Sequence, residues 1–171
     1  MSNRSSVKGQ ALVEFALALP IFLLIVYGLL EAGRLIFVYA AVTTASREAV
    51  RYASAAGKAG DPTYPQMLTY QDCDGIRARA RNTGFLLNLQ DDQIEIYWDH
   101  PGTVTPTPYC DNPGQTEDFI TLHTGDRVLV NVTTHYTLLV PLVPFTSRDI
   151  SSGLTARTFM GVIDLIPTPT P

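Results

Sequence analysis

Apolar residues are concentrated in the first third of the chain, in a run that no later segment matches. Sixteen residues without a charge separate Glu14 from Glu31, and including residues 11–13 lengthens the apolar run to about twenty. At 1.5 Å per residue, a helix of about twenty residues spans a hydrocarbon core of about 30 Å. The pattern predicts a transmembrane helix in which Glu14 is the one charged residue.

Beyond Gly33 the apolar positions narrow to a stripe. They recur at alternating spacings of four and three, which places them on one face of a helix, at Val38, Val42, Ala45, Ala49, Tyr52 and Ala56. Gly57 and Gly60 are stop signals, so we predict one helix from Gln10 to Ala56, kinked at Pro20. The stripe has two interpretations, packing against the protein's own domain or against a partner helix.

In the remaining residues, apolar and polar positions alternate in short segments, as in a small strand-rich domain. We predict a short helix over 74–82, capped by Asp72 or Asp74 and ended near Gly84. Strands are predicted, with a hairpin turn over 123–126, at Gln93–Trp98, Asp118–His123, Arg127–Leu139 and Leu154–Ile163. The predicted class is α+β, with an antiparallel sheet following a pilin-like helix. The chain then divides into a leader (1–9), a long helix (10–57), an exported domain (58–166) and a Pro/Thr tail (167–171).

Charge is distributed unevenly along the chain. Residues 1–58 hold six basic and three acidic groups, whereas residues 59–171 hold six basic and thirteen acidic groups. Arg4 and Lys8 precede the apolar run, so the positive-inside tendency places the N-terminus in the cytoplasm and the domain outside. A net charge of −4 with only two lysines argues against nucleic-acid binding.

A cleavable secretory signal is the main competitor for the N-terminal segment. Its small-residue cleavage motif could only be residues 16–18, which lie inside the apolar run, or residues 53–55, which lie more than twenty residues beyond it. Neither position fits such a signal, and the pattern favours a retained anchor.

Cys73 and Cys110 both lie in the predicted exported domain. Export makes a disulfide the expected state of the two thiols. A metal site would need His100 and a fourth ligand in addition, without the usual paired spacing.

Motifs of catalysis are absent from the sequence. The three histidines lie beside no nucleophile motif, and Asp91, Asp92 and Glu95 read either as calcium ligands or as a solvated turn. We therefore expect no enzymatic activity, cofactor, metal or small-molecule substrate.

A short basic leader that ends at Gly9 precedes Gln10 and the apolar helix, and Glu14 follows five residues after the glycine. This arrangement resembles the class III signal of type IV prepilins. The resemblance implies cleavage between Gly9 and Gln10 by a prepilin peptidase. It also implies that Glu14 pairs with the N-terminal amine of a neighbouring subunit.

The wider segment resembles the TadE-like family, pseudopilins of tight-adherence (Flp-type) pilus systems. The features that match are residues 11–15, Pro20, Glu31 with residues 33–34, residues 47–49 and residues 51–53. The resemblance implies a single-pass protein of the bacterial cytoplasmic membrane, with other Tad pilins, the pilus assembly platform and the processing peptidase as partners. The residues it implicates in assembly and helix packing are Glu14, Pro20, Glu31, Arg34, Ala45, Arg47, Glu48, Ala49 and Arg51.

Two of these groups can pair along the helix. Glu31 lies three residues before Arg34, and Glu48 lies three residues before Arg51. Such charges form either a solvated face or a docking site for a partner helix. The alternative to the pilin function is an unprocessed, membrane-anchored ectodomain that binds an extracellular partner.

Overall fold

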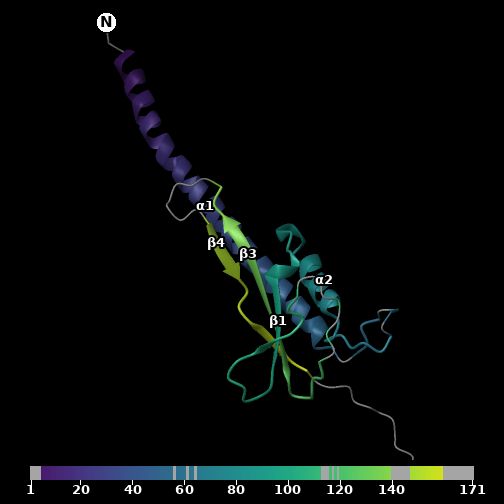
Figure 1. The fold of residues 1–171 in the computed structure, drawn as a ribbon. Coiled ribbons are helices and arrows are strands. Elements are labelled where there is room, and N and C mark those ends of the chain that lie inside the picture. The colour runs from purple at the N-terminus through teal and green to yellow at the C-terminus, as the bar shows by residue number, and fades with distance from the viewer. Residues whose placement is uncertain are drawn as a thin grey trace, which may run out of the picture.

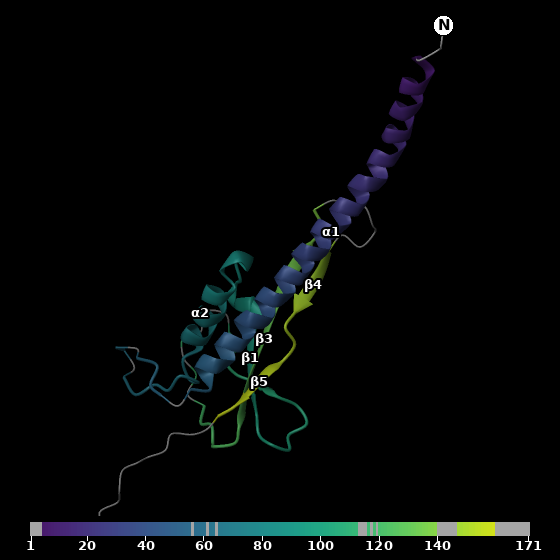
Figure 2. The ribbon, with the colours of Figure 1, turned by 180° about the vertical axis from the view of Figure 1, so that it is seen from behind.

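One helix runs from the N-terminal region through the whole length of the domain. A computed structural model describes residues 5–55, 57–60, 62–63, 65–112, 116, 118, 120–139 and 147–159. In it α1 is continuous over Ser5–Ala53. Its N-terminal half projects alone and its C-terminal half lies along the domain (Figures 1 and 2). The predicted long helix is confirmed, although it begins five residues earlier and ends three residues sooner than the pattern indicated.

The second helix packs beside the C-terminal half of α1. α2 (Cys73–Thr83) begins after Asp72, whose carboxylate accepts a hydrogen bond of 2.8 Å from the Gly75 N–H, and ends at Gly84. The helix extends one residue beyond each end of the predicted range 74–82, and Asp72, one of the two predicted caps, caps it. Two short 3-10 helices follow, η1 (Phe85–Leu87) and η2 (Asp91–Gln93).

An antiparallel sheet forms the second layer of the domain, in the order β2-β1-β3-β4 with β5 also on β3. Its strands are β1 (Ile94–Asp99), β2 (Thr107–Pro108), β3 (Arg127–Thr137), β4 (Ser147–Ser151) and β5 (Thr155–Thr158). β4 and β5 follow one another along β3, but Thr133 aligns with Ser151 whereas Val130 aligns with Thr155. One extra residue therefore separates the two strands, as in a β-bulge, and Gly153 there has a φ of +68°.

The hydrophobic core lies between α1, α2 and the sheet. From α1 it takes Val42, Ala45, Ala49 and Ala53, all fully buried, with Val38 and Tyr52 at its margin. The other layers contribute Ile76, Ala80, Ile94, Ile96, Val128, Val130 and Val132. Ser46 is also buried, and its hydroxyl donates to the carbonyl of Val130 at 3.1 Å. The apolar stripe of α1 thus packs against the protein's own domain; Ala56 lies outside the described residues.

Small side chains set the distance between the layers. A Cβ added at Gly84 would lie 3.4 Å from the Ala45 Cβ and 2.8 Å from a methyl group of Leu89. A larger side chain at these positions would push α2 away from α1, because protein interiors have few spaces to absorb it.

The strand predicted over 118–123 is wrong for the residues of that segment that the structure describes. Asp118 donates its N–H to the carbonyl of Gln71 at 2.8 Å and accepts the N–H of Cys110 at 3.0 Å. The Gln71 side chain in turn donates to the carbonyl of Ile120 at 3.0 Å. The segment therefore packs against the approach to α2 rather than adding to the sheet.

The other strand predictions need smaller corrections. β1 and β3 fall within one or two residues of their predicted bounds, and of 154–163 the structure forms a strand over Thr155–Thr158. Residues 160–163 lie outside the described part. β2 and β4 were not predicted, since a two-residue strand and the polar segment Ser147–Ser151 carry no apolar alternation.

Cys73 and Cys110 form a disulfide, with their Cα atoms 5.5 Å apart. The bond joins the first residue of α2 to the segment that follows β2, and both cysteines are buried. The predicted pairing is confirmed.

We expect removal of this disulfide in a Cys73→Ala/Cys110→Ala variant to lower the free energy of unfolding by about 4 kcal/mol, the loop-entropy value for a separation of 37 residues. Denaturant unfolding of the full chain in detergent, followed by Trp98 fluorescence, measures the change. Reduction of the wild-type protein is the control and should give a similar loss. An unchanged midpoint in both would contradict a stabilising role.

Candidate membrane and assembly site

The N-terminal half of α1 presents an apolar surface on every side. The segment Gly9–Ala53 is long and apolar enough to cross a membrane. From Gly9 to Leu30 only Val26 and Tyr27 are half-buried, and the other side chains are exposed. Glu14 is the one charged residue among them, and it accepts a hydrogen bond of 3.1 Å from the side-chain amide of Gln10. Such a surface needs lipid or other protein around it, because soluble monomers do not expose contiguous apolar patches of this size.

The predicted processing site lies within the helix. Gly9 and Gln10 both belong to the first two turns of α1, and a Cβ added at Gly9 would meet nothing within 4 Å. Pro20 also lies inside α1, which is continuous from Ser5 to Ala53. The proline removes one backbone donor, and the helix tolerates the loss.

Glu31, Arg34 and Tyr136 meet where α1 first touches the domain. The Glu31 side chain is buried, and its Oε1 accepts from the Tyr136 hydroxyl at 2.5 Å and from an Arg34 Nη at 3.1 Å. Burial, followed by the hydrogen bond to Glu31, raises the pKa of Tyr136. Oε2 of Glu31 is buried without a hydrogen-bond partner among the described residues. An ionised carboxylate in this position depends on both donors.

Arg34 connects the same cluster to the backbone of β3. Its guanidinium lies 4.6 Å from the centre of the Tyr136 ring and donates to the carbonyl of Thr137 at 2.9 Å. The pairing of Glu31 with Arg34 was predicted from their spacing, and both side chains turn toward the domain. We call Glu31, Arg34 and Tyr136 the exit cluster, since it fixes the end of β3 to α1 at the end of the apolar run.

The exit cluster could be found only in part from the sequence. Tyr136 lies in phase with Val128, Val130 and Val132, so the alternation of β3 places it on the face toward α1. Nothing in the sequence indicates that its partner is a residue 105 positions earlier.

Further along α1, charged and small residues separate onto different faces. Arg47 is exposed, and Arg51 pairs with Glu48 at 2.6 Å on the surface of the helix. Ala45 and Ala49, which the resemblance also associated with helix packing, are fully buried in the domain core. In this fold their side chains pack inside the domain, whereas Arg47, Glu48 and Arg51 lie at the surface of this part of α1.

At the end of the domain far from the apolar half of α1, two histidines flank a buried carboxylate. Asp126 is 1% exposed; its Oδ1 lies 2.5 Å from Nδ1 of His100, and its Oδ2 accepts the backbone N–H of His123 at 2.8 Å. Burial would raise the pKa of Asp126, but these hydrogen bonds and the nearby histidines bring it below its usual value. Arg127 pairs with buried Asp99 beside it. The group stabilises the turn before β3 and was not anticipated from the sequence.

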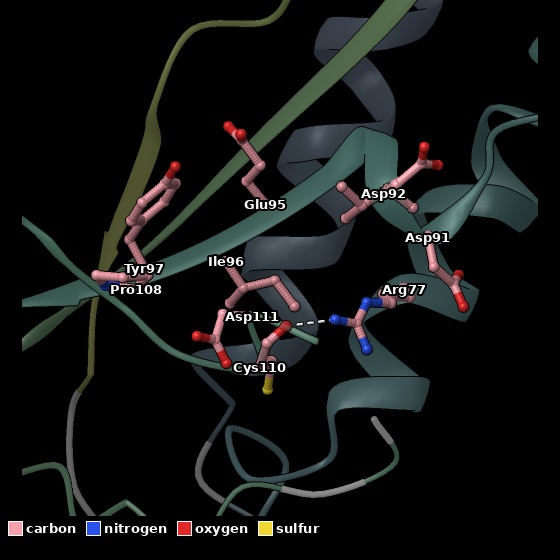
Figure 3. Close-up of a pocket in the computed structure, with 10 residues that line it drawn as sticks. Arg77, Asp91, Asp92, Glu95, Ile96, Tyr97, Pro108, Cys110 and Asp111 are labelled. Carbon is pink, nitrogen blue, oxygen red and sulfur yellow. Dashed lines mark hydrogen bonds between the residues drawn. The ribbon is translucent and has the colours of Figure 1, made fainter. Parts of the chain in front are cut away.

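A pocket of about 240 Å³ opens between α2, β1 and the disulfide segment (Figure 3). Arg77 is buried in its wall and donates to the carbonyls of Cys110 and Asn112. The carboxylates of Asp92, Glu95 and Asp111 point in different directions (Figure 3). Among the residues that the structure describes, no group of three acidic, histidine or cysteine side chains is placed to hold a metal ion. Arg77 serves to hold the Cys110 segment against α2.

Comparison with known protein families gives a match to the N-terminal part of the chain. Residues 9–51, about a quarter of the chain, match the family model described as TadE-like protein. The match begins at Gly9 and includes Glu31 and Arg34 of the exit cluster and the Glu48–Arg51 pair, all of them in α1. No curated protein and no solved structure matches the chain. The family resemblance of the N-terminal segment is thereby confirmed, and the domain after residue 51 is described by its structure alone.

We expect Tyr136→Phe to lower the free energy of unfolding of the domain by about 1.5–3 kcal/mol, because it removes a hydrogen bond to a buried carboxylate. Tyr39→Phe is the matched control, since Tyr39 is exposed on α1, and it should change stability by less than about 0.5 kcal/mol. Denaturant unfolding in detergent measures both. Equal effects of the two substitutions would show that the exit cluster contributes nothing specific.

Proposed function

From the premise that the N-terminal quarter of this chain is of the TadE-like type, we propose that the protein is a membrane-anchored minor pilin or pseudopilin of Tad (Flp-type) pilus assembly. Its role is structural rather than enzymatic. The observation that carries the proposal is the division of α1 into two halves. The N-terminal half is apolar and exposed, whereas the C-terminal half is the central element of the domain. A subunit that is held in a membrane by one end and assembles through its helix needs this division.

The charges and the disulfide support one membrane topology. Arg4 and Lys8 favour retention of the N-terminus in the cytoplasm, and the acidic domain is then exported. A buried disulfide between Cys73 and Cys110 supports this placement, since such bonds persist in oxidising compartments outside the cytoplasm. We propose the bacterial cytoplasmic membrane as the site of insertion.

Processing after Gly9 requires the first turns of α1 to open. A peptidase binds an extended backbone, whereas Gly9 and Gln10 are helical. Glycine lowers the cost of opening because it is about 1 kcal/mol less favourable in a helix than alanine. Residues 5–9 form the N-terminal end of α1, and helix ends fray, so the proposed cut lies where α1 opens most easily.

Cleavage would also change the surroundings of Glu14. The new N-terminus would lie four residues before it, one helical turn away, and the Gln10 side chain already contacts its carboxylate. In lipid an unpaired carboxylate costs about 2.5–3.5 kcal/mol on insertion scales, so a cationic partner is favoured. We propose that the terminal amine of a neighbouring subunit supplies it during assembly.

The intact mass of the protein extracted from membranes of cells that contain a prepilin peptidase tests this function. We expect the wild-type chain to lack residues 1–9, and Gly9→Val to retain them because the branched side chain obstructs the cut. Gly28→Val is the matched control, since a Cβ there meets no other atom and the site is remote from the leader. It should mature like the wild type.

Retention of the leader in all three proteins would contradict the pilin function. It would instead favour an unprocessed, membrane-anchored ectodomain.

A further inference from the structure

The outward face of α1 stays apolar well beyond the residue at which the uncharged run ends. Ile36, Phe37 and Tyr39 are each more than half exposed, and together with Leu35 they continue the apolar surface past Leu30. Glu31 and Arg34 do not interrupt this face, because both turn toward Tyr136 and the end of β3. The next charged side chain along α1 is Arg47.

This arrangement changes which twenty residues best fit the hydrocarbon core. A window over residues 11–30 contains Glu14, whose carboxylate pairs with no cation among the side chains that the structure describes and accepts only from the Gln10 amide there. A window over residues 15–34 has the same length of about 30 Å, and its only charges are Glu31 and Arg34, which neutralise one another at its outer end. The second window leaves Glu14 at the inner boundary, where its carboxylate can reach the headgroups. This placement of Glu14 avoids most of the free-energy cost of burying a charge in lipid.

The headgroup layer then reaches Tyr39. With headgroups a bilayer is about 40–45 Å thick, so each interfacial layer is about 5–8 Å deep. Tyr39 lies five residues, or about 7.5 Å, beyond Arg34. Aromatic side chains concentrate in this layer, which suits both Phe37 and Tyr39.

The end of the sheet lies level with Arg34, at the inner edge of this headgroup layer. β3 runs toward the N-terminal half of α1 (Figures 1 and 2), and the carbonyl of Thr137 at its end accepts from Arg34. The chain continues from Thr137 into Leu138 and Leu139, and the Leu139 side chain is 71% exposed. Arg148, which aligns with Tyr136 from β4, is exposed and can bind the phosphate of a headgroup.

We propose that the outer leaflet of the membrane covers α1 as far as Tyr39 and contacts the domain at Leu138–Leu139. The occupant of this apolar face is lipid, because the face is continuous with the membrane-spanning part of α1 and has no polar boundary before Thr43 and Thr44. The inference rests on the proposed insertion of α1. In this arrangement the domain contacts the bilayer surface at the exit cluster, rather than being separated from it by an exposed segment of α1.

Tryptophan quenching by brominated lipids tests the proposal on the full chain, reconstituted at low density in vesicles. Trp98, in β1, provides the background signal. Phe22→Trp reports insertion of α1, Phe37→Trp and Leu139→Trp report the proposed contact, and Val104→Trp, at a 96% exposed site, is the matched control. All four positions are exposed, so none of the substitutions changes the core.

We expect quenching of Phe22→Trp by bromines deep in the acyl chains, and of Phe37→Trp and Leu139→Trp by bromines near the headgroups. Val104→Trp should respond no more than the wild type. Absence of quenching at either Phe37→Trp or Leu139→Trp, with Phe22→Trp quenched, would overturn the proposal. This result would still be consistent with insertion of α1 in the membrane. It would favour a partner helix, rather than lipid, on the exposed face of α1 around Phe37. An unquenched Phe22→Trp would instead refute insertion itself.

Discussion

The structure depends on one constraint: a single unbroken helix must be compatible with two different environments. From Ala11 to Leu30, α1 is exposed on nearly all sides, and Glu14 is the only charged residue in that range. From Val38 onward only one stripe is buried, and that stripe is made largely of small residues, with Ala45, Ala49 and Ala53 at its centre. Because these side chains are short, α2 and β3 approach the helix closely, and the domain is built on α1 rather than beside it.

The exit cluster lies at the boundary between the two environments. Two of its members come from α1 and the third, Tyr136, is the penultimate residue of β3, so they attach the sheet to the helix at the end of the apolar run. A buried carboxylate that depends on a tyrosine and an arginine is costly when either donor is lost. The cluster therefore penalises any separation of the domain from the helix at this level. The cluster therefore fixes the position of the domain relative to the apolar half of α1.

The parts that followed from sequence are those that depend on local pattern. The length of α1, the Asp72 cap and Gly84 end of α2, and the alternation of β3 all reflect interactions within a few residues. The Cys73–Cys110 bond followed from the number of cysteines and the predicted compartment. The parts that failed depend on distant partners. The segment 118–123 has strand-like composition, but Gln71 supplies its hydrogen bonds from another loop.

At the exit cluster, too, sequence predicts contacts between neighbouring residues but not contacts between distant ones. Glu31 and Arg34 are a local pair and were predicted, whereas Tyr136 and the carbonyl of Thr137 reach them only through the fold. Ala45 and Ala49 belong to a stripe that has the same spacing whether it packs against its own domain or against a partner. Arg77 and Asp126 are buried charged groups in polar segments, and composition gives no reason to place either in the interior.

The central claim is that α1 passes from lipid into the domain as one rigid helix held by the exit cluster. Hydrogen exchange of the full chain in lipid nanodiscs tests it most directly. The account predicts slow amide exchange without a gap from residue 25 to residue 50, and faster exchange around residues 31–38 in Tyr136→Phe. A segment of fast exchange near Gly33 in the wild-type protein would contradict it, since the domain would then be attached through a hinge.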